Sequence, residues 1–224
     1  MNLKMILIIL LLIVIVESTI IAIPYLANLN QYMAYKTTYP KAGYQSASFP
    51  FSVFNRPVTN NTEHEFDPAY TGSWQIDIDS TLVPSSTQSL TEAEMAFAPS
   101  GPSESQSIPT IIVQERADGL LRVEYFEQSW PNSYGLVLYN SSSPGWTRGT
   151  NVTILFRSFG SPSPIDPQIA PRSNGNVTLL VGSSAVLLDY PIAWANLSDL
   201  YLYGYPNSSF TSGSIQISIY QISG

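Results

Sequence analysis

Apolar and polar residues alternate along short segments from residue 72 onward, and this period of two predicts β-strands. In residues 74–79, Trp74, Ile76 and Ile78 would share one face of a strand. The last such segment is residues 215–220. Further segments of the same kind are residues 110–114, 120–126, 134–139, 152–156, 177–181, 185–189 and 200–205.

Turn residues separate these segments at the spacing typical of a sandwich or barrel. Asp118 and Gly119 lie between two of them, and residues 182–184 between two others. No amphipathic helical period interrupts about ten predicted strands. We therefore predict an all-β fold over residues 71–224: a two-sheet antiparallel β-sandwich, preceded by one N-terminal hydrophobic helix.

Residues 28–70 show no sustained helical period and carry nine tyrosine and phenylalanine residues among many Ser, Thr, Asn and Pro. We interpret this segment as an extended, aromatic-rich stalk. Flexible linkers seldom carry so many aromatic side chains, so part of the segment is expected to dock on a sheet, either its own or a neighbour's.

Residues 5–16 are uninterrupted Met, Ile, Leu and Val, and we assign residues 1–27 to an N-terminal membrane segment or signal peptide. Three interpretations stay open. The first is a cleaved leader. The second is an uncleaved anchor over residues 5–27, which would carry Glu17 inside the membrane, and the third is the assembly helix of a pilin-like subunit.

The remainder of the chain is expected to be exported, on a cell or virion surface or secreted, because Lys4 is the only positive charge before the apolar run. Six Asn-x-Ser/Thr sequons agree with an extracellular glycoprotein. They begin at Asn60, Asn140, Asn151, Asn176, Asn196 and Asn207.

Composition excludes several classes of site. The chain has no cysteine and one histidine, His64, in a polar segment interpreted as a surface loop, so we expect no metal site and no Ser-His-Asp triad. Lysine occurs only at positions 4, 36 and 41, and the net charge is −7, so nucleic acid is not an expected partner. No phosphate-binding loop or dinucleotide motif is present, and no cofactor is expected.

Charged residues make up only 11% of the chain, against about 25% in ordinary soluble domains. Such a surface is solvated by hydroxyl and amide groups. Attached glycans would explain it, and so would an acidic external medium in which carboxylates are neutral, as on the surface of an extremophile.

Three C-terminal segments resemble the end of concanavalin A-like jelly rolls. They are a hairpin with a small turn in residues 177–189, a strand ending in glycine in residues 197–204, and a final strand opening with Gly-x-Ile in residues 213–220. The resemblance implies a jelly-roll sandwich, and either glycan binding or glucan hydrolysis.

Glucanases of that family use two carboxylates on one sheet face, and the local match here is Glu92 and Glu94. The two side chains would point the same way in a strand, but the segment equally suits a short helical turn capped by Ser89. The family's fuller pattern of two glutamates flanking an aspartate is absent. Glu124 and Glu127 are interpreted as solvated edge charges.

Tyr201, Tyr203 and Tyr205 alternate along one predicted strand and would place three rings on one face. Burial in the core is one interpretation. The other is a binding platform that stacks sugar rings or a partner's surface.

These features predict a non-catalytic, surface-displayed structural or adhesive glycoprotein, such as a cell-surface filament subunit or a virion spike or turret component. Its expected partners are the membrane, through the N-terminal helix, further copies or other surface proteins, and glycans. The alternatives are a lectin-like glycan-binding protein and a secreted glycoside hydrolase.

Overall fold

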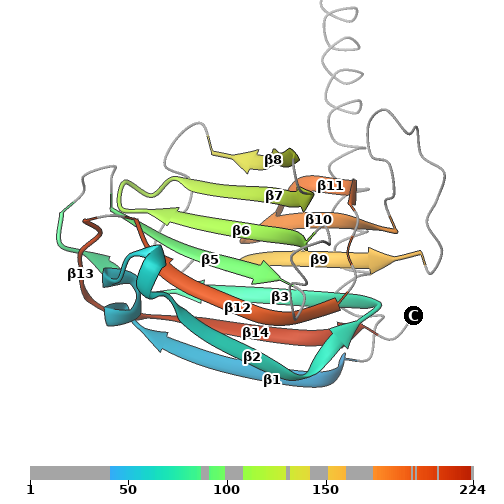
Figure 1. The fold of residues 1–224 in the computed structure, drawn as a ribbon, viewed down its shortest axis with the longest axis horizontal. Coiled ribbons are helices and arrows are strands. Elements are labelled where there is room, and N and C mark those ends of the chain that lie inside the picture. The colour runs from blue at the N-terminus through green and yellow to red at the C-terminus, as the bar shows by residue number, and fades with distance from the viewer. Residues whose placement is uncertain are drawn as a thin grey trace, which may run out of the picture. The chain divides into compact units, whose positions relative to one another are not determined.

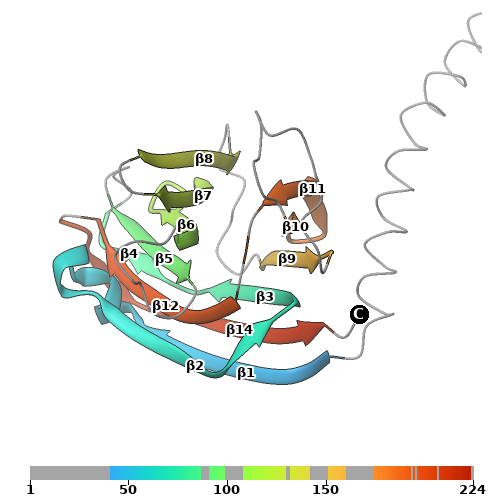
Figure 2. The ribbon, with the colours of Figure 1, turned by 45° about the vertical axis from the view of Figure 1, so that its right-hand side comes forward.

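The alternating segments form two six-stranded antiparallel sheets that face each other, as Figures 1 and 2 show. The computed structural model describes residues 41–86, 91–98, 108–129, 132–141, 151–159, 174–192, 194, 196–205 and 207–222. The predicted β-sandwich is confirmed. The predicted N-terminal helix and membrane segment, residues 1–27, lie outside the described residues.

Sheet A contains both chain-terminal strands of the described region. Its spatial order is β1 (Lys41–Pro50), β14 (Ser214–Ile222), β3 (Ser73–Ser80), β9 (Val152–Ser158), β10 (Gly175–Val181) and β11 (Ser184–Ile192). Sheet B has the order β2 (Thr62–Thr71), β12 (Asn196–Gly204), β5 (Glu92–Ala98), β6 (Ile108–Arg116), β7 (Leu121–Ser129) and β8 (Asn132–Asn140).

Short elements close one end of the sandwich. The pair β4 (Val83–Pro84) and β13 (Phe210–Ser212) forms a two-stranded ladder, and the 3-10 helices η1 (Phe51–Asn55) and η2 (Val58–Asn60) connect β1 to β2. None of the helices in the described part of the chain is long and apolar enough to cross a membrane.

The core lies between the sheets and is built from the apolar half of each alternating strand. Trp74, Ile76 and Ile78 on β3 are fully buried, as the alternation predicted. Ile217 on β14 and Met95 on β5 are buried in the same cluster. Because each such side chain stabilises the fold by about 1.5–3 kcal/mol when buried, this alternation fixes which face of each sheet points inward.

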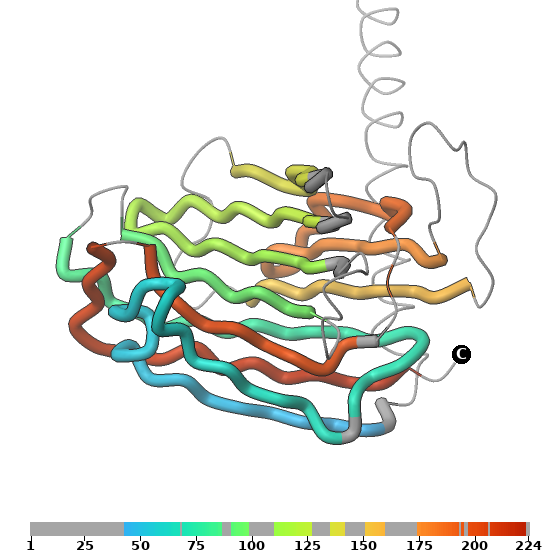
Figure 3. The backbone as a smooth tube through the Cα atoms, in the orientation of Figure 1, coloured from blue at the N-terminus to red at the C-terminus, as the bar shows by residue number. Residues whose placement is uncertain are grey.

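Residues 41–70 belong to the sandwich, which corrects the predicted stalk over residues 28–70. β1 pairs with β14 and β2 pairs with β12 within the same chain, and Figure 3 shows these blue and cyan segments along one side of both sheets. Pro68 lies in the part of β2 where the register with β12 shifts, between the pairs Leu197–Tyr70 and Asp199–Glu65, and an edge strand tolerates proline at such a position. Residues 28–40 lie outside the described residues.

His64 also differs from its assignment to a surface loop. It lies on β2, and its ring makes edge contacts with Phe49 and Phe66 at centroid distances of 5.5 and 5.0 Å. The polar residues around it are the outward half of an alternating strand, which is why the segment looked like a loop.

Gly204, the last residue of β12, allows η1 to pack directly on this strand. Its N–H donates to the carbonyl of Arg56 at 2.7 Å, and an added Cβ would lie 1.9 Å from the carbonyl oxygen of Phe54. No side-chain rotation can relieve a clash with backbone.

We therefore expect Gly204→Ala to lower the free energy of unfolding by about 3 kcal/mol, measured by urea denaturation. Gly135→Ala is the matched control, because its added Cβ would meet only the Phe126 side chain, at 3.2 Å. Equal losses in the two variants would contradict this account of Gly204.

Candidate functional site

The candidate site lies on the face of sheet B that points away from the core. Across β12, β5, β6 and β7, the register aligns Tyr203, Glu94, Gln114 and Arg122 in one row. Their neighbours Leu202, Met95, Val113 and Val123 point inward and are buried. The buried apolar row therefore fixes the position of the polar row, because shifting one strand by a single residue would exchange the side chains on its two faces.

A second row runs beside the first one. It aligns Tyr201 on β12, Ala96 on β5, Ile112 on β6 and Glu124 on β7. Ala96 is 7% exposed although it faces away from the core, because both of its cross-strand neighbours carry longer side chains. The face is thus closely packed around the centre of β5.

Glu94 is the most enclosed carboxyl group of this site, with 8% of the residue exposed. Burial raises the pKa of Glu94, because the charged form loses its hydration. Hydrogen bonds from the Gln114 amide and the Tyr203 hydroxyl partly oppose that increase, and the negative charge of Glu124 adds to it. Burial likewise raises the pKa of Tyr203, which stays the hydrogen-bond donor to Glu94.

Glu124 enters the site from β7 and is paired with Arg122 two residues earlier on the same strand. Sequence analysis placed Glu124 among solvated edge charges, since nothing local indicated its neighbours. Its proximity to Glu94 arises from the register of three strands, which the sequence alone does not specify.

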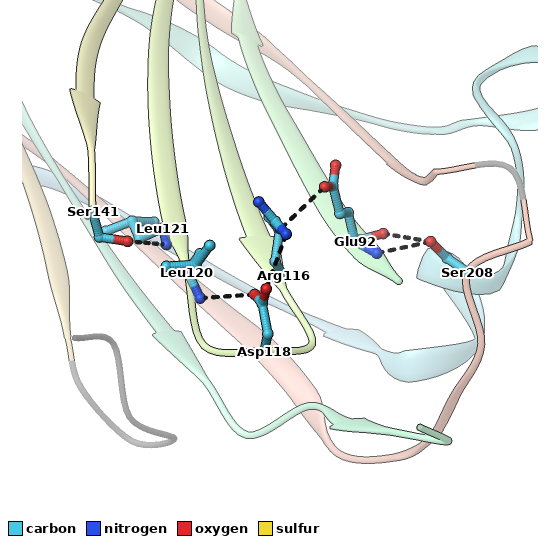
Figure 4. Close-up of polar contacts among 7 residues, drawn as sticks. All are labelled: Glu92, Arg116, Asp118, Leu120, Leu121, Ser141 and Ser208. Carbon is cyan, nitrogen blue, oxygen red and sulfur yellow. Dashed lines mark hydrogen bonds and ion pairs between the residues drawn. The ribbon is translucent and has the colours of Figure 1, made fainter. Parts of the chain in front are cut away.

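Glu92 lies at the start of β5 and shares the outward face with Glu94. The Ser208 hydroxyl bonds to both the N–H and the carbonyl of Glu92, at 2.9 Å each. The Glu92 carboxylate lies 3.5 Å from Arg116, which also contacts Asp118 at 2.9 Å (Figure 4). Burial raises the pKa of Glu92, Arg116 lowers it, and the charge of Glu94 raises it again.

The structure brings both groups of predicted site residues together. Glu92 and Glu94 lie in a strand, not in the alternative helical turn, and Tyr201 and Tyr203 occupy the adjacent strand on the same face. Tyr205 follows β12 with an exposed side chain, and its N–H donates to the Glu92 carbonyl at 3.1 Å. Among the described residues, no three His, Asp or Glu side chains gather in a metal-binding arrangement.

The predicted glycosylation sites lie on the sandwich. Asn60, Asn140 and Asn207 are exposed, and Asn151 and Asn176 are half-buried. Asn196 begins β12. Glycosylation of these residues stays a prediction.

Comparisons with known proteins give structural matches only. No protein-family model matches the chain, and no curated protein sequence matches it either. A fructofuranosidase from Schwanniomyces occidentalis, solved with fructose, is similar over 84% of this chain and 35% of its own, with 8% identity and a TM-score of 0.48. The chain therefore spans about a third of that enzyme's length.

Two further neighbours match over a larger share of their own length. A β-1,3-1,4-glucanase (lichenase) derived from a mouse hindgut metagenome is 11% identical, covers 81% of both chains and has a TM-score of 0.41. The κ-carrageenase from Pseudoalteromonas carrageenovora, solved with an oligotetrasaccharide, is 7% identical, covers 72% of this chain and 68% of its own, and has a TM-score of 0.41.

At such identities the likeness concerns the fold alone, and in that respect it agrees with the resemblance to concanavalin A-like jelly rolls. The expectation of a non-catalytic structural or adhesive glycoprotein is overturned, and so is the expectation that the protein is not an enzyme. Both are corrected by the finding that these structural neighbours are glycoside hydrolases.

Because the pKa of Glu94 is raised, we expect the free energy of unfolding to depend on pH. The folded protein holds the Glu94 carboxyl proton more tightly than the unfolded chain does, in which a glutamate has a pKa of about 4.3. The contribution of Glu94 to stability is therefore complete below that pH and is lost as the pH rises through the folded-state pKa. Glu92 and Asp199, whose pKa values burial also raises, act in the same direction.

We expect Glu94→Gln to reduce the decline in the free energy of unfolding between about pH 4 and pH 8, measured by urea denaturation at several pH values. Asp67→Asn, which alters an exposed carboxyl group, should leave the decline unchanged. A Glu94→Gln profile that parallels the parent profile would show that Glu94 titrates normally.

Proposed function

We propose that the protein is a secreted glycoside hydrolase whose catalytic groups are Glu94 and Glu124. The observation that carries this proposal is an enclosed carboxyl group of raised pKa on the same outward sheet face as a second, ion-paired carboxylate, whose charge contributes to that pKa. Glycoside hydrolysis requires two carboxyl groups in different protonation states, one of which acts as the acid.

The electrostatics assign the two roles. Burial raises the pKa of Glu94 and the charge of Glu124 adds to that increase, so we assign Glu94 the role of the acid; Glu124, which is paired with Arg122, takes the other role. Glu94 then protonates the glycosidic oxygen as the bond to the sugar breaks. Glu124 either attacks the sugar carbon or activates a water molecule, according to the separation of the two carboxyl groups in the substrate complex.

Tyr201 and Tyr203 would position the substrate. Tyr203 bonds to Glu94 through its hydroxyl, and Tyr201 lies beside Ala96 in the next row. A tyrosine ring stacks on the face of a sugar while its hydroxyl donates a hydrogen bond. Secretion, as part of this proposal, rests on the apolar run of residues 5–16 and on the sequons.

Replacing Glu94 tests the proposal. We expect Glu94→Gln to lower kcat on a cleaved polysaccharide by about 10²–10⁴-fold, because the amide cannot donate the proton, with release of reducing ends as the measurement. Glu124→Gln should cause a loss of similar size and Glu92→Gln a smaller one, while Asp67→Asn should have no effect. The parent's activity should fall as the pH rises through the raised pKa of Glu94.

Two outcomes would contradict the proposal. Full turnover by Glu94→Gln would remove Glu94 from the mechanism. Binding of a glycan without turnover by the parent protein would make the chain a lectin-like glycan-binding protein.

A second candidate function is acid-dependent hydrolysis of peptide bonds, which the hydrogen bond between Gln114 and Glu94 favours. In that reaction Glu94 in its ionised form would take a proton from the attacking water, and a raised pKa makes it a stronger base. The Gln114 amide would then stabilise the negative charge that develops on the carbonyl oxygen as water adds to the carbonyl carbon.

The two functions differ in their dependence on Gln114. If the protein cleaves peptides, Gln114→Ala should lower kcat by about 10²–10³-fold, and Glu124→Gln should have little effect. The assay is cleavage of a denatured protein between about pH 3 and pH 6, the range in which glutamates titrate. Absence of cleavage by the parent protein throughout this range would eliminate the second candidate.

A further inference from the structure

The outward face of sheet A, opposite in direction to the candidate site, carries a pair of tyrosine rings. Tyr44 on β1 is 57% exposed, and its ring centroid lies 5.1 Å from that of Tyr220 on β14, with an interplanar angle of 37°. The rest of this face near the pair is polar. We call Tyr44, Tyr220 and the adjacent row Ser46, Ser218, Asp77 and Thr153 the tyrosine platform.

A β-bulge directs Tyr44 onto this face. The register between β1 and β14 shifts between Ala42 and Gln45, so two residues, Gly43 and Tyr44, oppose Tyr220 alone. Gly43 has a φ of 61°, in the left-handed region that glycine adopts without strain. Bulges of this kind re-aim a side chain, and here the re-aimed side chain is the exposed ring.

The Tyr44 hydroxyl is hydrogen-bonded to the polar row of this face. The Tyr44 oxygen accepts hydrogen bonds from Ser46 and Ser218, and these lower its pKa. Ser46 and Ser218 also contact each other at 3.3 Å. An exposed tyrosine with an anchored hydroxyl and a supported ring loses little further freedom when a ligand stacks on it.

The surrounding groups indicate the chemistry of the ligand. Asp77 accepts from the Gln75 amide at 2.8 and 2.9 Å and from the Thr153 hydroxyl at 2.6 Å, which fixes its carboxylate beside the rings. Asp79 accepts from Asn151 at 3.1 Å. Two carboxylates on this face repel anions, and the neighbouring hydroxyl and amide groups match the hydrogen bonding of sugar hydroxyls.

We infer that the tyrosine platform is a second carbohydrate-binding site, which holds a segment of a neutral polysaccharide chain by stacking on Tyr44 and Tyr220. The site uses none of the residues proposed for catalysis. It would keep the protein on a polymer surface between bond cleavages, in the manner of a binding module fused to an enzyme.

The inference is tested by affinity electrophoresis in gels that contain neutral mixed-linkage β-glucan, β-1,3-glucan or galactomannan, with anionic κ-carrageenan for comparison. The parent protein should be retarded by at least one neutral polymer and not by the anionic one. Tyr44→Ala and Tyr220→Ala should weaken that binding about fivefold to tenfold, while Tyr44→Phe, which keeps the ring, should retain most of it.

Phe159→Ala is the matched control, since Phe159 is an exposed aromatic residue outside the platform, at 46% exposure. It should bind like the parent protein. Thermal denaturation of each variant verifies that the fold is intact, and hydrolysis of a short oligosaccharide should be unchanged in Tyr44→Ala, because a short chain does not reach both faces.

Failure of this inference is distinct from failure of the proposed function. Equal retardation of the parent protein and Tyr44→Ala, or retardation by none of the neutral polymers, would overturn the platform even if hydrolysis is observed. Weaker binding of Tyr44→Ala in a protein without any hydrolytic activity would establish the platform and reject the hydrolase.

Discussion

The register of the four central strands of sheet B is the constraint on which the candidate site depends. Glu94, Gln114 and Tyr203 come from segments far apart in the chain, and no direct sequence signal joins them. They meet because Met95, Val113 and Leu202 must all point into the core. Moving any one strand by a single residue would expose these apolar side chains and bury charged ones, at a cost of several kcal/mol for each strand.

The same packing creates the electrostatics of the site. A carboxyl group on an outward face would normally be hydrated, yet Glu94 is enclosed by the longer side chains of neighbouring strands. Its raised pKa follows from lost hydration and from the charge of Glu124, both of which are consequences of strand pairing. Glu92 and Asp199 shift in the same direction. Carboxyl groups that favour their protonated forms suit the sparsely charged composition and an acidic medium.

Sequence reasoning predicted the sandwich because its central strands alternate clearly. β3 and β14 place isoleucine at successive inward positions, and each of these side chains is fully buried. β1 was missed because its inward residues are partly small, with Ala47 before Phe49, and β2 because it contains Pro68. Both are edge strands, which pair on one side only and therefore tolerate a weaker alternation of apolar and polar residues.

The site was only partly predictable for a related reason. Glu92 and Glu94 could be selected because residues two apart in a strand share a face, which is a local rule. Glu124 could not, since its relation to Glu94 passes through β6 and needs the register of two ladders. The absence of cysteine and the single histidine argued against thiol and histidine chemistry, but these two counts say nothing about chemistry that uses carboxyl groups alone. Two carboxyl groups of unequal pKa are sufficient for glycoside hydrolysis, and Asp and Glu occur in every composition class. A chain poor in cysteine, histidine and lysine is restricted in the chemistry it can perform, and the carboxylate catalysis that we propose lies within that restriction.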